Sequence, residues 1–151
     1  MLVMKIPEFL SSTNVSVDVA ATDKDQLLEE LARRAAPVFD VLPDVILSEL
    51  VKREQLGSTG VGGGVAIPHA RFHQVTKPYG VLVRLRKPID FDAVDGKAVD
   101  VVFLLLLPDA PDNERLGALA TIARKLRDPA VMAALRRARD GAEIYRALAA
   151  D

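Results

Sequence analysis

The chain of 151 residues contains no cysteine. This absence excludes disulfide frameworks, zinc ribbons and thiolate catalysis, and it is compatible with a reducing compartment. Long apolar runs are also absent, since the longest, Val101 to Leu107, is far shorter than the roughly 20 residues of a membrane-spanning helix. The first ten residues, MLVMKIPEFL, lack the ordered parts of a secretory signal. We therefore expect a cytoplasmic protein without membrane insertion.

The sequence also lacks an excess of charge of one sign. Its 20 Lys and Arg residues are interleaved with 21 Asp and Glu residues, and the formal net charge is −1. Because no basic stripe follows from this pattern, nucleic-acid binding is not expected. Half of the residues are hydrophobic and 27% are charged, which is typical of a globular protein. With no internal repeat or linker, we predict a single domain over residues 1–151.

Three segments have strand patterns. The sequence VSVDV at 15–19 alternates apolar and polar residues, as does YGVLVRLR at 79–86, and VAIP is a short apolar strand closed by proline. The run AVDVVFLLLL is continuously apolar, which is typical of a central strand covered on both faces. Helices must supply that cover.

Five helices are expected around these strands. A capping box of Thr22 and Asp25 predicts the start of the first, and Pro43 suits the first turn of the second, which ends near Gln55. Three more are expected at 113–126, 130–139 and 142–148. Strands and helices in this order predict an α/β fold in which the sheet lies between two helical layers, an α/β/α sandwich.

Five glycines precede a Pro-His pair in the stretch REQLGSTGVGGGVAIPHAR, residues 53–71. A phosphate-binding P-loop is excluded, because the motif lysine is absent and the order of helix and strand is reversed. The dinucleotide fingerprint fails because these glycines do not open a helix. His69 and His73 are four residues apart, but no glutamate lies between them and no third histidine exists, so we expect no metal.

Two interpretations of this stretch remain. In the first, it is a flexible turn and His69 bonds a nearby carbonyl. In the second, the amides of Gly60, Gly62 and Gly63 form a concave nest for an anion. Nearby groups that can bind an anion support the second: the hydroxyls of Ser58 and Thr59 and the guanidinium of Arg53. Pro68 also fixes the chain before the imidazole of His69 at the end of a strand. A neutral imidazole aimed at an anion site suits phosphoryl transfer.

The stretch REQLGSTGVGGGVAIPHAR closely resembles the active-site signature of the fructose, mannitol and nitrogen-regulatory class of enzyme IIA domains of the bacterial phosphoenolpyruvate-dependent phosphotransferase system. The likeness extends to PIDFDAVDGKAVDVVFLLLLP and to the helix through LRDP. It implies a type-2 enzyme IIA fold with a mixed sheet and no cofactor. It also implies that His69 takes a phosphoryl group from the phosphohistidine of an HPr-like protein, and that Arg53 is the family's phosphate-site arginine.

One residue departs from the resemblance. Members commonly carry a second active-site histidine in a pattern like NEHL, whereas this chain reads NERL, with Arg115 at that place. A permanently charged arginine would hold the phosphoryl oxygens more tightly than a neutral histidine and would slow onward transfer. The alternative is that Arg115 is an ordinary solvated residue in the first turn of a helix.

The chain has neither a transmembrane segment nor a IIB cysteine, so it looks most like the nitrogen-regulatory branch. That branch implies nitrogen- and potassium-related regulation, with target proteins such as transporters or kinases. Two alternatives stay open: a sugar-specific enzyme IIA that passes phosphate to a IIB partner, and a regulatory binding module that is not phosphorylated.

Overall fold

The structure is a computed structural model that describes residues 4–109 and 113–150, and the side chains of residues 113–115 lie outside its described part. Two short 3-10 turns, Ile6–Glu8 and Ser12–Asn14, precede the regular elements. The strands are β1 (Val15–Val19), β2 (Gly60–Gly62), β3 (Val65–Ala66), β4 (His69–Phe72), β5 (Tyr79–Ile89) and β6 (Val99–Pro108). The helices are α1 (Lys24–Phe39), α2 (Pro43–Gln55), α3 (Asn113–Lys125), α4 (Pro129–Arg137) and α5 (Gly141–Ala149).

The strands form one mixed sheet of six strands in the order β1-β5-β6-β3-β2, and β4 also pairs with β6. Strand β6 runs antiparallel to β5 and parallel to β3 and β4. It is therefore central, which explains why its sequence is apolar at nearly every position. The parallel pairing sets His69 opposite Leu105.

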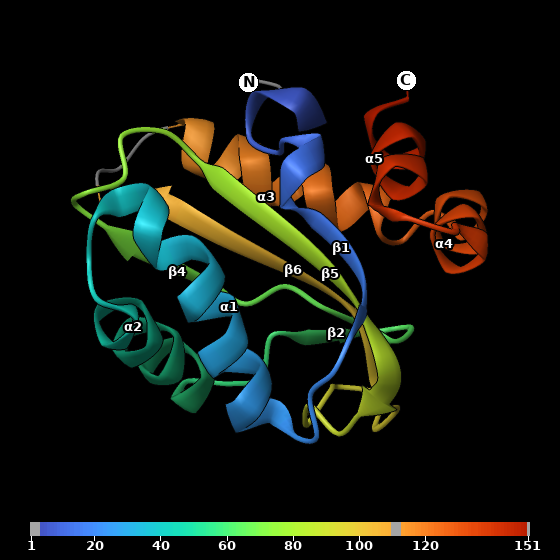
Figure 1. The fold of residues 1–151 in the computed structure, drawn as a ribbon, viewed down its shortest axis with the longest axis horizontal. Coiled ribbons are helices and arrows are strands. Elements are labelled where there is room, and N and C mark those ends of the chain that lie inside the picture. Colours follow the sequence, from blue (N-terminus) through green and yellow to red (C-terminus); the bar gives the residue numbers. More distant parts are fainter. Residues whose placement is uncertain (1–3, 110–112, 151) are drawn as a thin grey trace.

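Helices cover both faces of this sheet, with α1 and α2 on one side and α3, α4 and α5 on the other (Figure 1). Alternate side chains of β6 enter two separate hydrophobic clusters. Val102, Leu104 and Leu106 pack with α1 and α2. Phe103 and Leu105 belong to the cluster formed with α3, α4 and α5. The predicted three-layer α/β/α sandwich with a mixed sheet is confirmed.

The boundaries of several elements agree with the sequence patterns. Strand β1 has the predicted bounds, and α2 begins at Pro43 and ends at Gln55 as expected. Strand β5 continues to Ile89, three residues beyond the predicted end. The capping prediction for α1 was wrong, because the residue at the N-cap is Asp23, whose side chain accepts a hydrogen bond from the Gln26 amide at 2.8 Å.

The segment around the Pro-His pair differs most from the prediction. Strand β3 ends at Ala66, and His69 is the first residue of a further strand, β4, rather than the end of one. Both strands pair with β6, β3 at Val101 and β4 at Leu105. Pro68 therefore lies between two short strands that run along the same neighbour, and its carbonyl accepts from the Leu105 amide at 2.9 Å.

None of the helices in residues 4–109 and 113–150 has the length and hydropathy needed to cross a bilayer. The single domain over residues 1–151 remains a prediction.

Candidate functional site

The two ring nitrogens of His69 have different partners. Nδ1 lies 2.8 Å from the carbonyl oxygen of Ile67, and because a carbonyl only accepts, Nδ1 carries the proton in the neutral ring. Nε2 then keeps its lone pair, and it accepts a hydrogen bond from Nε of Arg53 at 3.3 Å. The imidazole is half-buried. This tautomer presents Nε2 as the nucleophilic atom.

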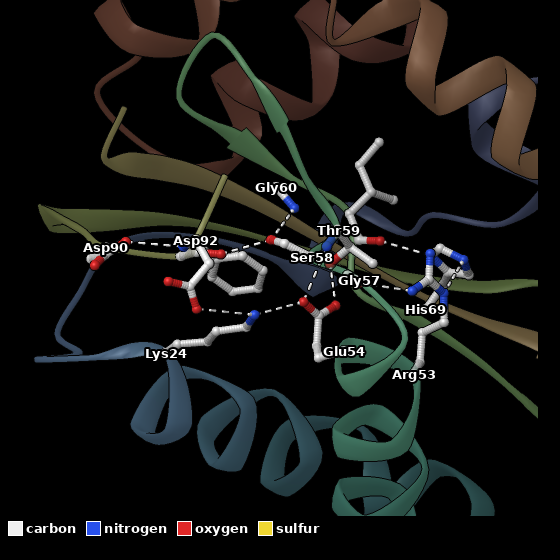
Figure 2. Close-up of polar contacts among 12 residues, drawn as sticks. Lys24, Arg53, Glu54, Gly57, Ser58, Thr59, Gly60, His69, Asp90 and Asp92 are labelled. Carbon is white, nitrogen blue, oxygen red and sulfur yellow. Dashed lines mark hydrogen bonds and ion pairs between the residues drawn. The ribbon is translucent and has the colours of Figure 1, made fainter. Parts of the chain in front are cut away.

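Arg53 reaches the imidazole from the last turn of α2. Its Nη1 donates to the carbonyl of Gly57 at 2.9 Å, which fixes the plane of the guanidinium beside the ring (Figure 2). The structure thus brings together the two residues for which the sequence predicts catalytic roles. A planar guanidinium in this position can donate to the oxygens of a phosphoryl group bound to Nε2.

The surroundings of His69 lower its pKa below the ordinary value of 6.5. Burial is the main cause, because it disfavours the charged ring, and the positive charge of Arg53 acts in the same direction. The hydrogen bond to Ile67 and the negative charge of Glu54 oppose this shift. His69 is therefore neutral near pH 7, the form that a nucleophile requires.

The hydroxyls of Ser58 and Thr59 are engaged within the protein. Ser58 donates to the carbonyl of Phe91 at 2.7 Å, and its oxygen accepts from the Gly60 amide at 3.0 Å. Thr59 donates both its hydroxyl and its amide to the carboxylate of Glu54 (Figure 2). These bonds fix the loop beside Arg53, and phosphate binding by Ser58, Thr59 and Gly60 stays a prediction.

The glycines at the tip of the β2–β3 hairpin are not brought to the imidazole. Val65 pairs with Val101 and His69 with Leu105, four residues further along β6, which corresponds to about 13 Å. Gly62 lies opposite Val65, and Gly63 follows at the turn, on the side away from His69.

Other residues of the chain already bind this tip. The Gly63 amide donates to Asp95 at 3.0 Å, and its carbonyl accepts from Arg136 at 2.8 Å. Phosphate binding by Gly62 and Gly63 remains a prediction that this geometry does not favour.

An open pocket of ≈ 510 Å³ lies in front of His69. It is formed by α2, β4, the end of β6 and α3, and its lining includes Arg53, Lys52, Arg71, Leu56 and Leu116. The two leucines are 85% and 62% exposed and give the pocket an apolar rim, and its lining carries three cations together with the acidic Glu49 and Asp109. Such a rim can exclude water from a contact with another protein while the cations attract phosphate.

The sequence analysis missed three residues of this region. Arg71 follows His69 by two residues in β4 and therefore lies on the same face of the strand. The sequence did not predict this placement of Arg71, because β4 was not expected as a strand. Lys52 and Glu54 flank Arg53 on α2, and nothing in the local pattern distinguishes them from other charged helix residues.

Two further candidates lie elsewhere or outside the described side chains. The backbone of Arg115 is in the first turn of α3, but its side chain lies outside the described part, so its role stays a prediction. His73 is exposed and follows the last residue of β4. Among the described residues, no group of three or more His, Asp or Glu side chains could hold a metal ion.

Comparison with known proteins assigns the class. The family model described as "Phosphoenolpyruvate-dependent sugar phosphotransferase system, EIIA 2" matches residues 8–151, and the chain belongs to this family. A nitrogen regulatory protein of Bradyrhizobium diazoefficiens is 41% identical over 146 residues, 97% of this chain and 95% of that protein. A fructose-specific EIIA component of Haloferax volcanii is 39% identical over 101 residues, 67% of this chain and 64% of that protein.

A solved structure agrees with this assignment. The crystal structure of the nitrogen regulatory protein IIA-Ntr from Neisseria meningitidis superimposes with a TM-score of 0.90 at 34% identity. The match covers 95% of this chain and 98% of that one. The resemblance to nitrogen-regulatory enzyme IIA is therefore confirmed in sequence and in fold.

Proposed function

We propose that this protein carries a phosphoryl group on Nε2 of His69, which it accepts from the phosphohistidine of an HPr-like protein. The observation that supports this most strongly is the tautomer of His69. Nδ1 is held by the Ile67 carbonyl at 2.8 Å, so the lone pair lies on Nε2, where it accepts from Nε of Arg53 at 3.3 Å beside the open pocket. Membership of the enzyme IIA family agrees with a phosphotransfer role.

The transfer exchanges one phosphorus–nitrogen bond for another. The lone pair of Nε2 attacks phosphorus, and the bond to the donor's ring nitrogen breaks with its electron pair returning to that nitrogen. A donor ring that is protonated on its other nitrogen leaves as neutral imidazole. The phosphorylated His69 ring keeps its proton on Nδ1, which donates to the Ile67 carbonyl. Arg53 stabilises the charge on the moving phosphoryl oxygens, so the step as proposed needs no metal.

The phosphorylated protein acts in nitrogen- and potassium-related regulation, through target proteins such as transporters or kinases. Support comes from the two nitrogen regulatory relatives, which match nearly the whole chain. Phosphorylation adds close to two negative charges in the pocket between Leu56 and Leu116. Such a change alters the affinity of that surface for a second protein by repulsion or by pairing with arginines.

The second candidate is a sugar-specific enzyme IIA that passes its phosphoryl group to a IIB partner. The fructose-specific relative, 39% identical over two thirds of this chain, is the observation in its favour. The two functions differ in the lifetime of the phosphorylated protein. A sugar-specific carrier loses the group rapidly to a IIB domain, whereas a regulator keeps it and binds its target differently.

Intact-mass measurement tests the proposal. After incubation with phosphoenolpyruvate, enzyme I and an HPr-like protein, we expect a gain of about 80 Da, one phosphoryl group. His69→Ala should abolish this gain, and His73→Ala should leave it unchanged. If the unmutated protein gains no mass, the carrier function fails and only a binding module that is not phosphorylated remains.

A further inference from the structure

The carboxylate of Glu54 is buried although it follows Arg53 directly on α2. Its side chain is 6% exposed and lies 2.9 Å from Nζ of Lys24. It also accepts the Thr59 amide at 3.1 Å and the Thr59 hydroxyl. Burying a charged carboxylate costs desolvation free energy unless an opposite charge and hydrogen bonds compensate it. Lys24 supplies the charge and Thr59 supplies the hydrogen bonds.

These bonds fix the loop that holds Arg53. Residues 56–59 connect α2 to β2, and Thr59 at the far end of this loop is clamped to Glu54 at the end of the helix. Ser58 is pinned by the Phe91 carbonyl at 2.7 Å. The Gly57 carbonyl, which precedes these two anchors, accepts from Nη1 of Arg53 at 2.9 Å.

The ion pair with Lys24 explains why the neighbouring Glu54 carboxylate does not bind the guanidinium of Arg53. The Lys24 ammonium is 18% exposed, lies 4.6 Å from the centre of the Phe91 ring and pairs with Glu54 (Figure 2). Lys24 and Thr59 are the partners of the Glu54 carboxylate, and among the described residues no hydrogen bond joins it to Arg53. Nε of Arg53 therefore donates to His69, and Nη1 donates to the Gly57 carbonyl.

We propose that Glu54 is a positioning residue: by clamping Thr59 it fixes the Gly57 carbonyl, and that carbonyl holds Arg53 against Nε2 of His69. Its importance for phosphoryl transfer rests on the proposed function above. Glu54 does not touch the reacting atoms: it acts on them through the loop and Arg53, and its negative charge also raises the pKa of His69. A purely structural role would instead change the stability of the protein and leave Arg53 in place.

Three variants separate these roles. Glu54→Gln keeps the size of the side chain but removes the ion pair with Lys24, and Thr59→Val removes the hydroxyl bond at nearly constant volume. The matched control is Glu30→Gln, which removes a carboxylate that pairs with Arg33 and Arg34 on α1 and lines no part of the pocket. All three lose stability to some degree, which thermal unfolding measures.

The first measurement is the NMR signal of the Arg53 Nε–H group, and it needs no phosphorylation. In the unmutated protein we expect slow exchange of this proton, because Nε2 of His69 accepts it in a hydrogen bond. We expect exchange at least tenfold faster in Glu54→Gln and Thr59→Val, and unchanged exchange in Glu30→Gln. An unchanged Arg53 signal in both of the first two variants would overturn the proposal.

The second measurement is the rate of phosphoryl uptake from a phosphorylated HPr-like protein. We expect the maximal rate to fall about tenfold in Glu54→Gln and Thr59→Val, because Arg53 is then held less firmly at Nε2 of His69. The double variant should lose little more than either single variant, since both break the same clamp. An unchanged uptake rate in folded Glu54→Gln protein would contradict the proposal. If the unmutated protein takes up no phosphoryl group, the carrier function is rejected, and the NMR signal of Arg53 alone then tests whether Glu54 positions it.

Discussion

At the scale of single residues, the neighbours of His69 decide which of its nitrogens can react. The Ile67 carbonyl is two residues away in sequence, and it holds Nδ1 through a bond of 2.8 Å. Burial and Arg53 keep the ring neutral by lowering its pKa. The first interpretation is met in one respect, since His69 does bond a nearby carbonyl, and this bond places the lone pair on Nε2 beside Arg53. The anion nest of glycine amides stays a prediction.

The lowered pKa of His69 predicts a pH dependence. Phosphoryl uptake needs the neutral ring, so the rate should level off toward alkaline pH and fall in acid, with a midpoint below the ordinary pKa of 6.5. The same shift affects stability, because the unfolded chain takes up a proton at 6.5 while the folded protein resists it. Stability contributed by neutral His69 is thus present above 6.5 and is lost as the pH falls through the folded pKa. A ring titration by NMR with a midpoint above 6.5 would contradict this expectation.

Replacing Arg53 tests its role beside the ring. In Arg53→Met, we expect phosphoryl uptake to slow by about 10²- to 10³-fold, the usual effect of losing one donor to a developing charge. The pKa of His69 should rise at the same time, because a positive neighbour has been removed. Arg139→Met is the control, since the Arg139 side chain is 90% exposed and lines no pocket with His69. Equal rates for the two variants would remove Arg53 from the site.

At the scale of elements, the start of α1 shows how a local pattern can misplace a cap. Thr22 and Asp25 fit a capping box, yet Asp23 accepts the Gln26 amide at 2.8 Å. Thr22 instead donates its amide to the Gln26 side chain at 2.7 Å. We expect Asp23→Ala to lower the free energy of unfolding by about 1 kcal/mol and Thr22→Val to lower it by less. Urea unfolding would show the opposite order if Thr22 were the cap.

Elements with a strong local signal could be predicted from sequence, and those formed by distant pairing could not. Pro43 and the apolar run of β6 mark their elements directly. Strands β2, β3 and β4 contain 3, 2 and 4 residues, too few for a period to be visible, and of these only β3 was expected, from the apolar sequence VAIP. Strands β3 and β4 exist because they pair with β6, more than 30 residues later in the chain.

The candidate site divides in the same way. Arg53 and His69 lie in one recognisable stretch, so their proximity could be expected. The placement of the hairpin tip at Gly63 could not, because Asp95 and Arg136, which hold it, come from distant loops and helices.

At the scale of the whole molecule, β6 joins two hydrophobic clusters into one cooperative structure. Leu104 faces the cluster with α1 and α2, and Leu105 faces the cluster with α3, α4 and α5. Both side chains are 0% exposed. The pocket beside His69 is lined by α2 from one helical layer and by α3 from the other, so its geometry depends on both layers.

Truncation on either face should therefore destabilise the whole protein. We expect Leu104→Ala and Leu105→Ala each to lower the free energy of unfolding by about 2–5 kcal/mol. Leu42→Ala, at a side chain 74% exposed, should change it by less than about 0.5 kcal/mol. Fluorescence of Tyr79 and Tyr145, which pack against opposite clusters, should report one shared transition in single-tyrosine variants. Separate transitions would mean that the layers unfold independently.

The most direct test of the account is to locate the phosphoryl group on the ring. Long-range proton–nitrogen NMR correlations on ¹⁵N-labelled, phosphorylated protein distinguish the two nitrogens of His69. We expect phosphorus on Nε2 and a proton retained on Nδ1, as the bond to Ile67 requires. A phosphoryl group on Nδ1, or on any residue other than His69, would contradict the account.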